Sequence, residues 1–169
     1  MAALSFSNAI SQLKESKWYS DNVQELLDLI LQGKSTIHFL DYLDSKNIKL
    51  KDIKAQTMDV VLDYAELILE DDCLSDDEII NIRHLRRFFA IEDGEFLEYG
   101  KRDRVEAILI EQLEKLYADN KIDKEEMLHK SELQGLFGLG YDDYQDIVNK
   151  VAIEAYSRGA DLNDLDTYI

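Results

Sequence analysis

A long helical pattern runs through LKDIKAQTMDVVLDYAELILED, residues 50–71. The stretch contains neither proline nor glycine, and its apolar residues recur every three or four positions, as they do along one face of a helix. These residues are Ile53, Met58, Val61, Leu62, Ala65, Ile68 and Leu69. The spacing predicts one long helix over this range.

The same period recurs on both sides of this stretch. Before it, apolar stripes predict helices over residues 4–16 and 20–33, and a third from Ser35 with Ile37, Phe39, Leu40 and Leu43 inside. After it, helices are predicted near Ser75–Phe89, Glu95–Tyr117, Asp123–Phe137 and Asp142–Arg158. The second of these should be kinked or split at Gly100, because glycine costs about 1 kcal/mol inside a helix.

No segment alternates apolar and polar residues for long enough to predict a sheet. We therefore predict an all-α protein, a single bundle of about eight helices that forms one domain over residues 1–169. The absence of proline and the presence of only seven glycines agree with helices joined by short loops.

The composition limits the classes of partner. The net charge is −17, from 36 acidic and 19 basic residues, so the protein should repel nucleic acid and anionic membranes and attract cations or a basic protein. Cys73 is the only cysteine, which rules out an intramolecular disulfide and suits a reducing compartment. No signal-peptide pattern or transmembrane stretch is evident, so we expect a cytoplasmic location.

The second half of the chain repeats the first at an offset of 48 residues, without gaps. Both copies read as a helix, an acidic turn, a capping box, a helix that ends in phenylalanine, a short loop and another helix. Identical pairs include Glu66 and Glu114, Asp71 and Asp119, Glu78 and Glu126, Leu85 and Leu133, and Phe89 and Phe137. This pattern predicts a duplicated helical hairpin.

The second copy carries ADNKIDKEE at residues 118–126 and LFGL at residues 136–139, at the end of the following helix. With the preceding long helix, this pattern resembles the tellurite-resistance B (TerB-like) domain over about Val60–Ser157. The resemblance implies an all-α bundle of two related halves, linked to metal binding or stress response. It divides the chain into an N-terminal helical extension (1–58), a duplicated core (59–158) and an acidic tail (159–169). The first copy departs from the pattern, because Cys73 and Leu74 follow its two aspartates.

Two interpretations of the acidic turns remain open. If Glu126 closed an EF-hand loop, Lys115 and Tyr117 would occupy the first two ligand positions, where neither can serve, so no EF-hand is present. Asp123 with Glu126, and Ser75 with Glu78, instead fit capping boxes. The alternative, implied by the resemblance, is calcium or magnesium held jointly by the two turns. Its candidate ligands are Asp71, Asp72, Glu78, Asp119, Asp123 and Glu126.

Two further groups of charged residues are candidates for partner binding. Five arginines and a lysine gather between residues 83 and 104, and Arg83 and Arg87 share one helix face. They would either pair with acids of the same chain or dock an acidic partner or phosphate. The acids that neither caps nor arginines should use are expected to contact a basic partner. They are Asp142, Asp143, Asp146, Asp161, Asp164 and Asp166.

No catalytic pattern is present. His38, His84 and His129 lack the spacing of metal ligands, and no nucleophile, phosphate-loop or dinucleotide motif occurs. His38 is expected to be packed beside Phe39. We therefore predict a non-enzymatic interaction protein without a small-molecule substrate, linked to metal or stress. The alternative is an immunity protein that neutralises a basic toxin, such as a nuclease, since complementary charge accelerates such association.

Overall fold

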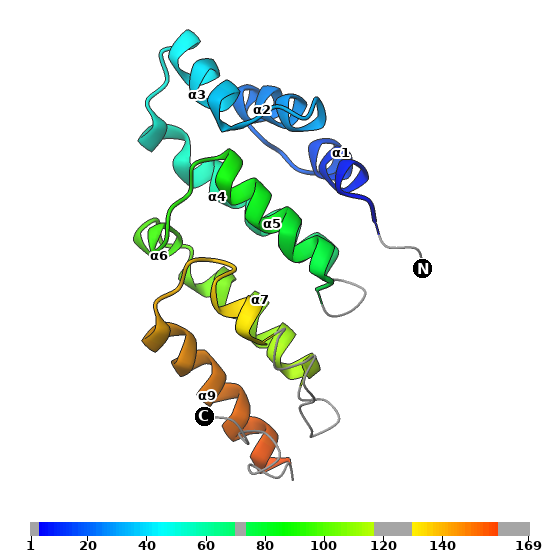
Figure 1. Ribbon diagram of the computed structural model, residues 1–169, viewed down its shortest axis with the longest axis vertical. Helices are drawn as coiled ribbons and strands as arrows, with labels where there is room; N and C mark the ends of the chain where they lie inside the picture. Colours follow the sequence, from blue (N-terminus) through cyan, green and yellow to red (C-terminus); the bar gives the residue numbers. More distant parts are fainter. Residues whose placement is uncertain (1–3, 70–73, 117–129, 159–169) are drawn as a thin grey trace. The chain divides into compact units, whose positions relative to one another are not determined.

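The computed structural model describes residues 4–69, 74–116 and 130–158 (Figure 1). All regular secondary structure in these ranges is helical, which confirms the all-α prediction. None of the described helices is both long and apolar enough to cross a membrane. The helices are α1 (Phe6–Ser16), α2 (Asp21–Leu31), α3 (Thr36–Ser45), α4 (Leu50–Ile68), α5 (Asp76–Phe88), α6 (Glu95–Glu98), α7 (Arg102–Leu116) and α9 (Tyr141–Ser157), and residues 130–134 are also helical.

The chain forms two compact units. The first contains α1 to α5, and the second contains Leu74, α6, α7, residues 130–134 and α9. The helices predicted as an extension over residues 1–58 therefore pack in the same unit as α4 and α5. The single domain over residues 1–169 stays a prediction, as does the acidic tail, which lies outside the described residues.

The first unit is built around α4, which packs against both α1 and α5. Six consecutive residues, 60–65, are buried, so this part of the helix has no face in water. A helix buried all round needs neighbours on more than one side. Its two buried charges have partners. Asp63 accepts a 2.7 Å hydrogen bond from Tyr19 Oη and pairs with Lys17, and Lys54 Nζ donates to the carbonyl oxygen of Ala90.

An aromatic cluster joins α3 to the end of α5. Phe39 lies 5.7 Å from both Phe88 and Phe89, measured between ring centroids. Only Phe39 and Leu43 of α3 are buried, and the prediction that Ile37 and Leu40 lie inside is wrong. Ile37 is 68% exposed and Leu40 45% exposed, because α3 buries one narrow face and these two residues lie on the other.

In the second unit, α7 and α9 lie side by side and run in the same direction (Figure 1). Ion pairs follow each other in order along both helices, from Arg102 with Asp143, through Glu106 with Lys150, to Glu114 with Arg158. The core beneath them includes Phe96 and Phe137, whose ring centroids are 5.6 Å apart. The predicted break at Gly100 is confirmed, since α6 ends before it and α7 begins after it.

Ala90 and Gly138, which are 48 residues apart, both adopt a left-handed backbone conformation, with φ of +51° and +65°. The amide of Ala90 donates to the carbonyl of Arg87, and the amide of Gly138 donates to the carbonyl of Gly135, again 48 residues later. The 48-residue shift therefore matches two turns of similar backbone geometry. The duplication as a whole stays a prediction.

Replacing Ala90 with glycine should stabilise the protein by about 0.5–1 kcal/mol. The left-handed conformation costs a residue with a Cβ about 1–2 kcal/mol, and glycine avoids this cost. Part of the gain is lost, because glycine has more conformational freedom than alanine in the unfolded chain. The free energy of unfolding in urea is the measurement. Gly100→Ala is the reciprocal control. It places a Cβ at φ +71° with no atom within 4 Å, so it should destabilise by a similar amount. A destabilised Ala90→Gly variant would contradict the strain argument.

Candidate functional site

The acidic turn of the first copy ends in a capping box at the start of α5. Ser75 Oγ accepts a 3.4 Å hydrogen bond from the amide of Glu78, and the Glu78 carboxylate accepts 2.8 Å hydrogen bonds from the amide and the hydroxyl of Ser75. This confirms the predicted box of Ser75 and Glu78. The Glu78 carboxylate therefore has a structural role in this turn.

The predicted metal site falls mostly outside the described residues. Glu78 is described, whereas Asp71, Asp72, Asp119, Asp123 and Glu126 are not. Within residues 4–69, 74–116 and 130–158, no three His, Cys, Asp or Glu side chains are grouped as metal ligands would be. Binding of calcium or magnesium by the two turns therefore stays a prediction.

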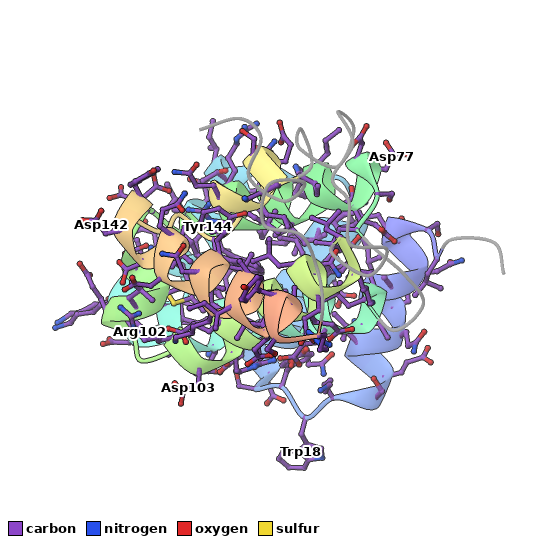
Figure 2. All side chains as sticks on the ribbon, turned by 90° about the horizontal axis from the view of Figure 1, so that it is seen from below. Trp18, Asp77, Arg102, Asp103, Asp142 and Tyr144 are labelled. Carbon is purple, nitrogen blue, oxygen red and sulfur yellow. The ribbon has the colours of Figure 1, made fainter. Side chains whose placement is uncertain are left out.

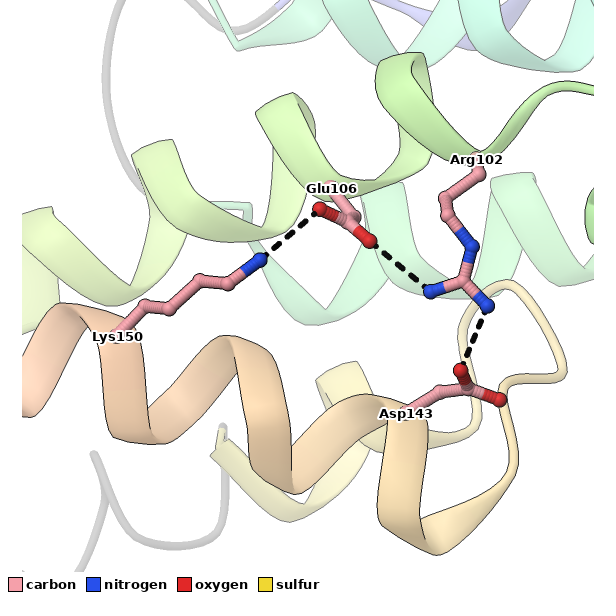
Figure 3. A network of polar contacts seen from close by, with 4 residues as sticks. All are labelled: Arg102, Glu106, Asp143 and Lys150. Carbon is pink, nitrogen blue, oxygen red and sulfur yellow. Dashed lines mark hydrogen bonds and ion pairs between the residues drawn. The ribbon is translucent and has the colours of Figure 1, made fainter.

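A network of four charged side chains connects α7 to α9 (Figure 3). Arg102 binds Asp143 at 2.7 Å and Glu106 at 3.1 Å, and Glu106 pairs with Lys150 at 3.5 Å. The hydrogen bonds that Arg102 donates to Asp143 and then to Glu106 raise the pKa of Arg102. Exposed pairs of this kind contribute about 0–1 kcal/mol each. Their main effect is to hold the two helices in one register.

This network changes the roles predicted for two groups of residues. Asp143 was expected to be unused by the arginines, whereas it binds Arg102. Of the arginine group, Arg102 pairs within the chain, as one of the two predicted alternatives required. Arg83 and Arg87 lie on α5, in the first unit, where Arg83 is half-buried and Arg87 is exposed. Their role in docking stays a prediction.

The face of α9 opposite the core carries two of the predicted partner-binding acids. Asp142 and Asp146 are exposed, and neither forms an ion pair with a residue in the described ranges. Further along the same face, Ile153 is 67% exposed and Tyr156 is 59% exposed. Asp161, Asp164 and Asp166 lie outside the described residues.

The sequence analysis did not predict that Ile153 and Tyr156 lie on the surface. The signal that could have found them is their spacing, because Asp142, Asp146, Asn149, Ile153 and Tyr156 follow one another at intervals of four and three residues. An apolar residue in a helix is more often assigned to the core. In α9 the core is instead formed by the opposite face, which buries Tyr144, Ile147, Val148, Val151 and Ala155.

Trp18, the only tryptophan, is fully exposed in the loop between α1 and α2, and its side chain points away from the helices (Figure 2). The loop itself is anchored after it. Tyr19 Oη donates to Asp63, and Ser20 Oγ donates to Gln56 Oε1 at 2.6 Å. Sequence reasoning did not single this residue out. Its indole gives a natural fluorescent reporter in the first unit.

The two histidines in the described ranges, His38 and His84, each contact a neighbouring side chain or backbone group of the fold. The prediction that His38 is packed beside Phe39 is wrong, because His38 is exposed and its Nδ1 accepts a 3.3 Å hydrogen bond from the amide of Ser35. This contact belongs to the capping box at the start of α3. His84 lies with its ring edge-on to Phe6, at 5.9 Å between centroids. His129 lies outside the described residues.

Tyr64 is a titratable group whose pKa is strongly shifted by its surroundings. It is fully buried in α4, 5.6 Å from the ring of Phe6, and burial raises the pKa of its hydroxyl to about 12. The neutral phenol is favoured in the folded state because the phenolate would lose its hydration there. Ionisation of this hydroxyl at alkaline pH should therefore lower the free energy of unfolding.

The chain matches no protein-family model, no curated protein and no solved structure. The similarity to the TerB-like domain therefore remains a resemblance of sequence pattern.

Replacing Ser75 with alanine should destabilise the protein by about 1 kcal/mol, because the amide at the third position of α5 loses its acceptor and Glu78 loses a donor. Urea unfolding at neutral pH is the measurement. Ser16→Ala is the matched control, since the hydroxyl of Ser16 only donates to a carbonyl of its own helix and its loss should be nearly neutral. Equal effects of the two changes would contradict the capping role.

The stability contributed by neutral Tyr64 should be fully present below pH 10 and be lost as the pH rises through 12. The sign follows from a folded-state pKa of about 12 against an ordinary value of 10.0. Between pH 9 and pH 12 the wild-type protein should therefore lose about 2 kcal/mol more unfolding free energy than Tyr64→Phe does. Denaturant titrations at several pH values test this. Parallel pH profiles of the two proteins would show that Tyr64 does not titrate differently on folding.

Proposed function

We propose that this protein is a non-enzymatic helical interaction protein whose acidic surface binds a basic protein partner. The observation that carries the proposal is the outer face of α9. There Asp142 and Asp146 project one turn apart, without a cationic partner in the described ranges. Like charges at this spacing cost a few tenths of a kcal/mol on a helix, and part of this cost is offset because Asp142 lies in the first turn of α9, where an acid suits the helix dipole.

Neighbouring charges strengthen this argument by contrast. Asp143 and Glu106 are also acidic residues, but they form ion pairs with Arg102 and Lys150 and so contribute to the packing of α7 on α9. Asp142 and Asp146 form no such ion pair with a residue in the described ranges. A basic surface that approached them would gain charge pairs without breaking existing ones.

The net charge of −17 supports the same class of partner. A field of this sign concentrates cations and cationic proteins near the surface and raises their association rates at low salt. It disfavours nucleic acid, whose phosphates would be repelled. A toxin-neutralising role and a stress-linked role would both use such a surface, and in the first case the partner would be a basic toxin.

The double reversal of Asp142 and Asp146 to lysine should slow association with the partner more than tenfold at low salt, while the melting temperature changes little. The partner is first recovered from a cell extract on the immobilised protein, and its association rate is then measured by surface plasmon resonance. For the wild-type protein this rate should fall steeply between low and near-molar salt, because the Debye length shrinks to about 3 Å at 1 M.

The matched control is the double reversal of Asp41 and Asp44, two exposed acids on α3 in the first unit. It makes the same change in net charge at another place. If both double variants slow association equally, only the net charge matters and the α9 surface is not the site. An association rate indifferent to salt would contradict the proposed partner class altogether.

A further inference from the structure

The outer face of α9 has the residue spacing of a coiled-coil seam. Residues 142, 146, 149, 153 and 156 alternate intervals of four and three, which keeps them on one line along the helix. The opposite line is buried in the second unit. The seam is about 21 Å long, given a rise of about 1.5 Å per residue. It therefore offers a partner helix about four turns to pack against.

The seam is divided into two chemically different halves. Asp142 and Asp146 occupy the amino-terminal half, and Ile153 and Tyr156 occupy the carboxy-terminal half. Asn149 lies between them and is also exposed. One flank is already held in place, because Asp143 and Lys150 are bound by Arg102 and Glu106 of α7. An approaching helix would therefore meet a surface that is largely preorganised on that side.

A second copy of this chain is a poor occupant of the seam. In an antiparallel pair, Asp142 would face Tyr156 and Asp146 would face Ile153, so each carboxylate would be desolvated against an apolar side chain. In a parallel pair, the acids of one copy would face the same acids of the other, and their repulsion would oppose association. The occupant must therefore be a different sequence with the complementary division of charge.

We propose that the α9 seam binds an amphipathic helix of the partner that has a basic half and an apolar half. Its lysine or arginine residues lie against Asp142 and Asp146, and its apolar residues lie against Ile153 and Tyr156. A partner helix in either direction can meet this requirement, provided that the two kinds of residue are segregated along one face. The inference rests on the proposed function, because it assigns a shape and a register to the basic partner.

The test uses the full-length protein and two synthetic helical peptides of identical composition, each labelled with a fluorophore. In the segregated peptide, lysines occupy the seam positions of one half and leucines those of the other. In the interleaved peptide, lysines and leucines alternate along the same seam. Fluorescence anisotropy at physiological salt should show that the segregated peptide binds at least tenfold more tightly.

Variants of the protein then separate the two halves. Ile153→Ser with Tyr156→Ser should weaken binding of the segregated peptide at least tenfold, and Asp142→Asn with Asp146→Asn should do the same. All four residues are exposed, so the fold should tolerate both changes. The matched control is Ile37→Ser with Leu40→Ser, which removes two exposed apolar residues from α3 and should leave binding unchanged.

The outcomes distinguish this inference from the proposed function. If only the aspartate variant weakens binding, the basic-partner proposal stands and the helix seam is wrong. If neither variant weakens binding, or if neither peptide binds, both proposals fail.

Two further results would assign the seam to another occupant and so overturn the inference. One is faster hydrogen exchange across residues 159–169 in the serine variant without any peptide, which would show that the chain's own end covers the seam. The other is a wild-type dimer in sedimentation that the serine variant abolishes.

Discussion

The burial of the middle of α4, residues 60–65, is the constraint from which the first unit follows. These six consecutive residues leave that part of the helix no exposed face, so it is stable only when other helices surround it. α1 and α5 supply two of those neighbours. The charges that α4 carries inside, on Lys54 and Asp63, are compensated by groups of the surrounding segments. Those contacts fix the loop after α1 and the turn after α5 relative to α4.

The second unit depends on a different arrangement, in which two parallel helices share a core on one side and a line of ion pairs along their edge. The ion pairs of Arg102, Glu106 and Lys150 contribute little energy individually, because Arg102 and Lys150 are exposed and Glu106 is only half-buried. Their effect is on geometry, because the opposite charges of α7 and α9 face each other when the two helices are in this register. The residues of the outer line of α9 take no part in these ion pairs. For that reason the same line carries both functional proposals.

Local patterns were predictable because their causes lie within a few residues. The box of Ser75 and Glu78 needs only a hydroxyl and a carboxylate three positions apart, and the break at Gly100 needs only a residue that tolerates a positive φ. One local contact was missed, because His38 was expected to be packed beside Phe39, whereas it is exposed and completes the cap of α3 with Ser35. Contacts between distant segments were not predictable in this way. Asp143 meets an arginine that lies 41 residues away in the sequence.

The sequence by itself determined that the chain is helical, where most of the described helices begin and end, and that its surface is strongly acidic. These properties follow from the helical period, from caps and from composition, which require no knowledge of neighbouring helices. Only the tertiary structure decided which apolar residues of α3 and α9 stay in contact with water. α3 exposes Ile37 and Leu40, and α9 exposes Ile153 and Tyr156, although all four residues are apolar. A periodic pattern shows that apolar residues share a face, but burial depends on whether another helix covers that face, and the neighbours come from distant parts of the chain.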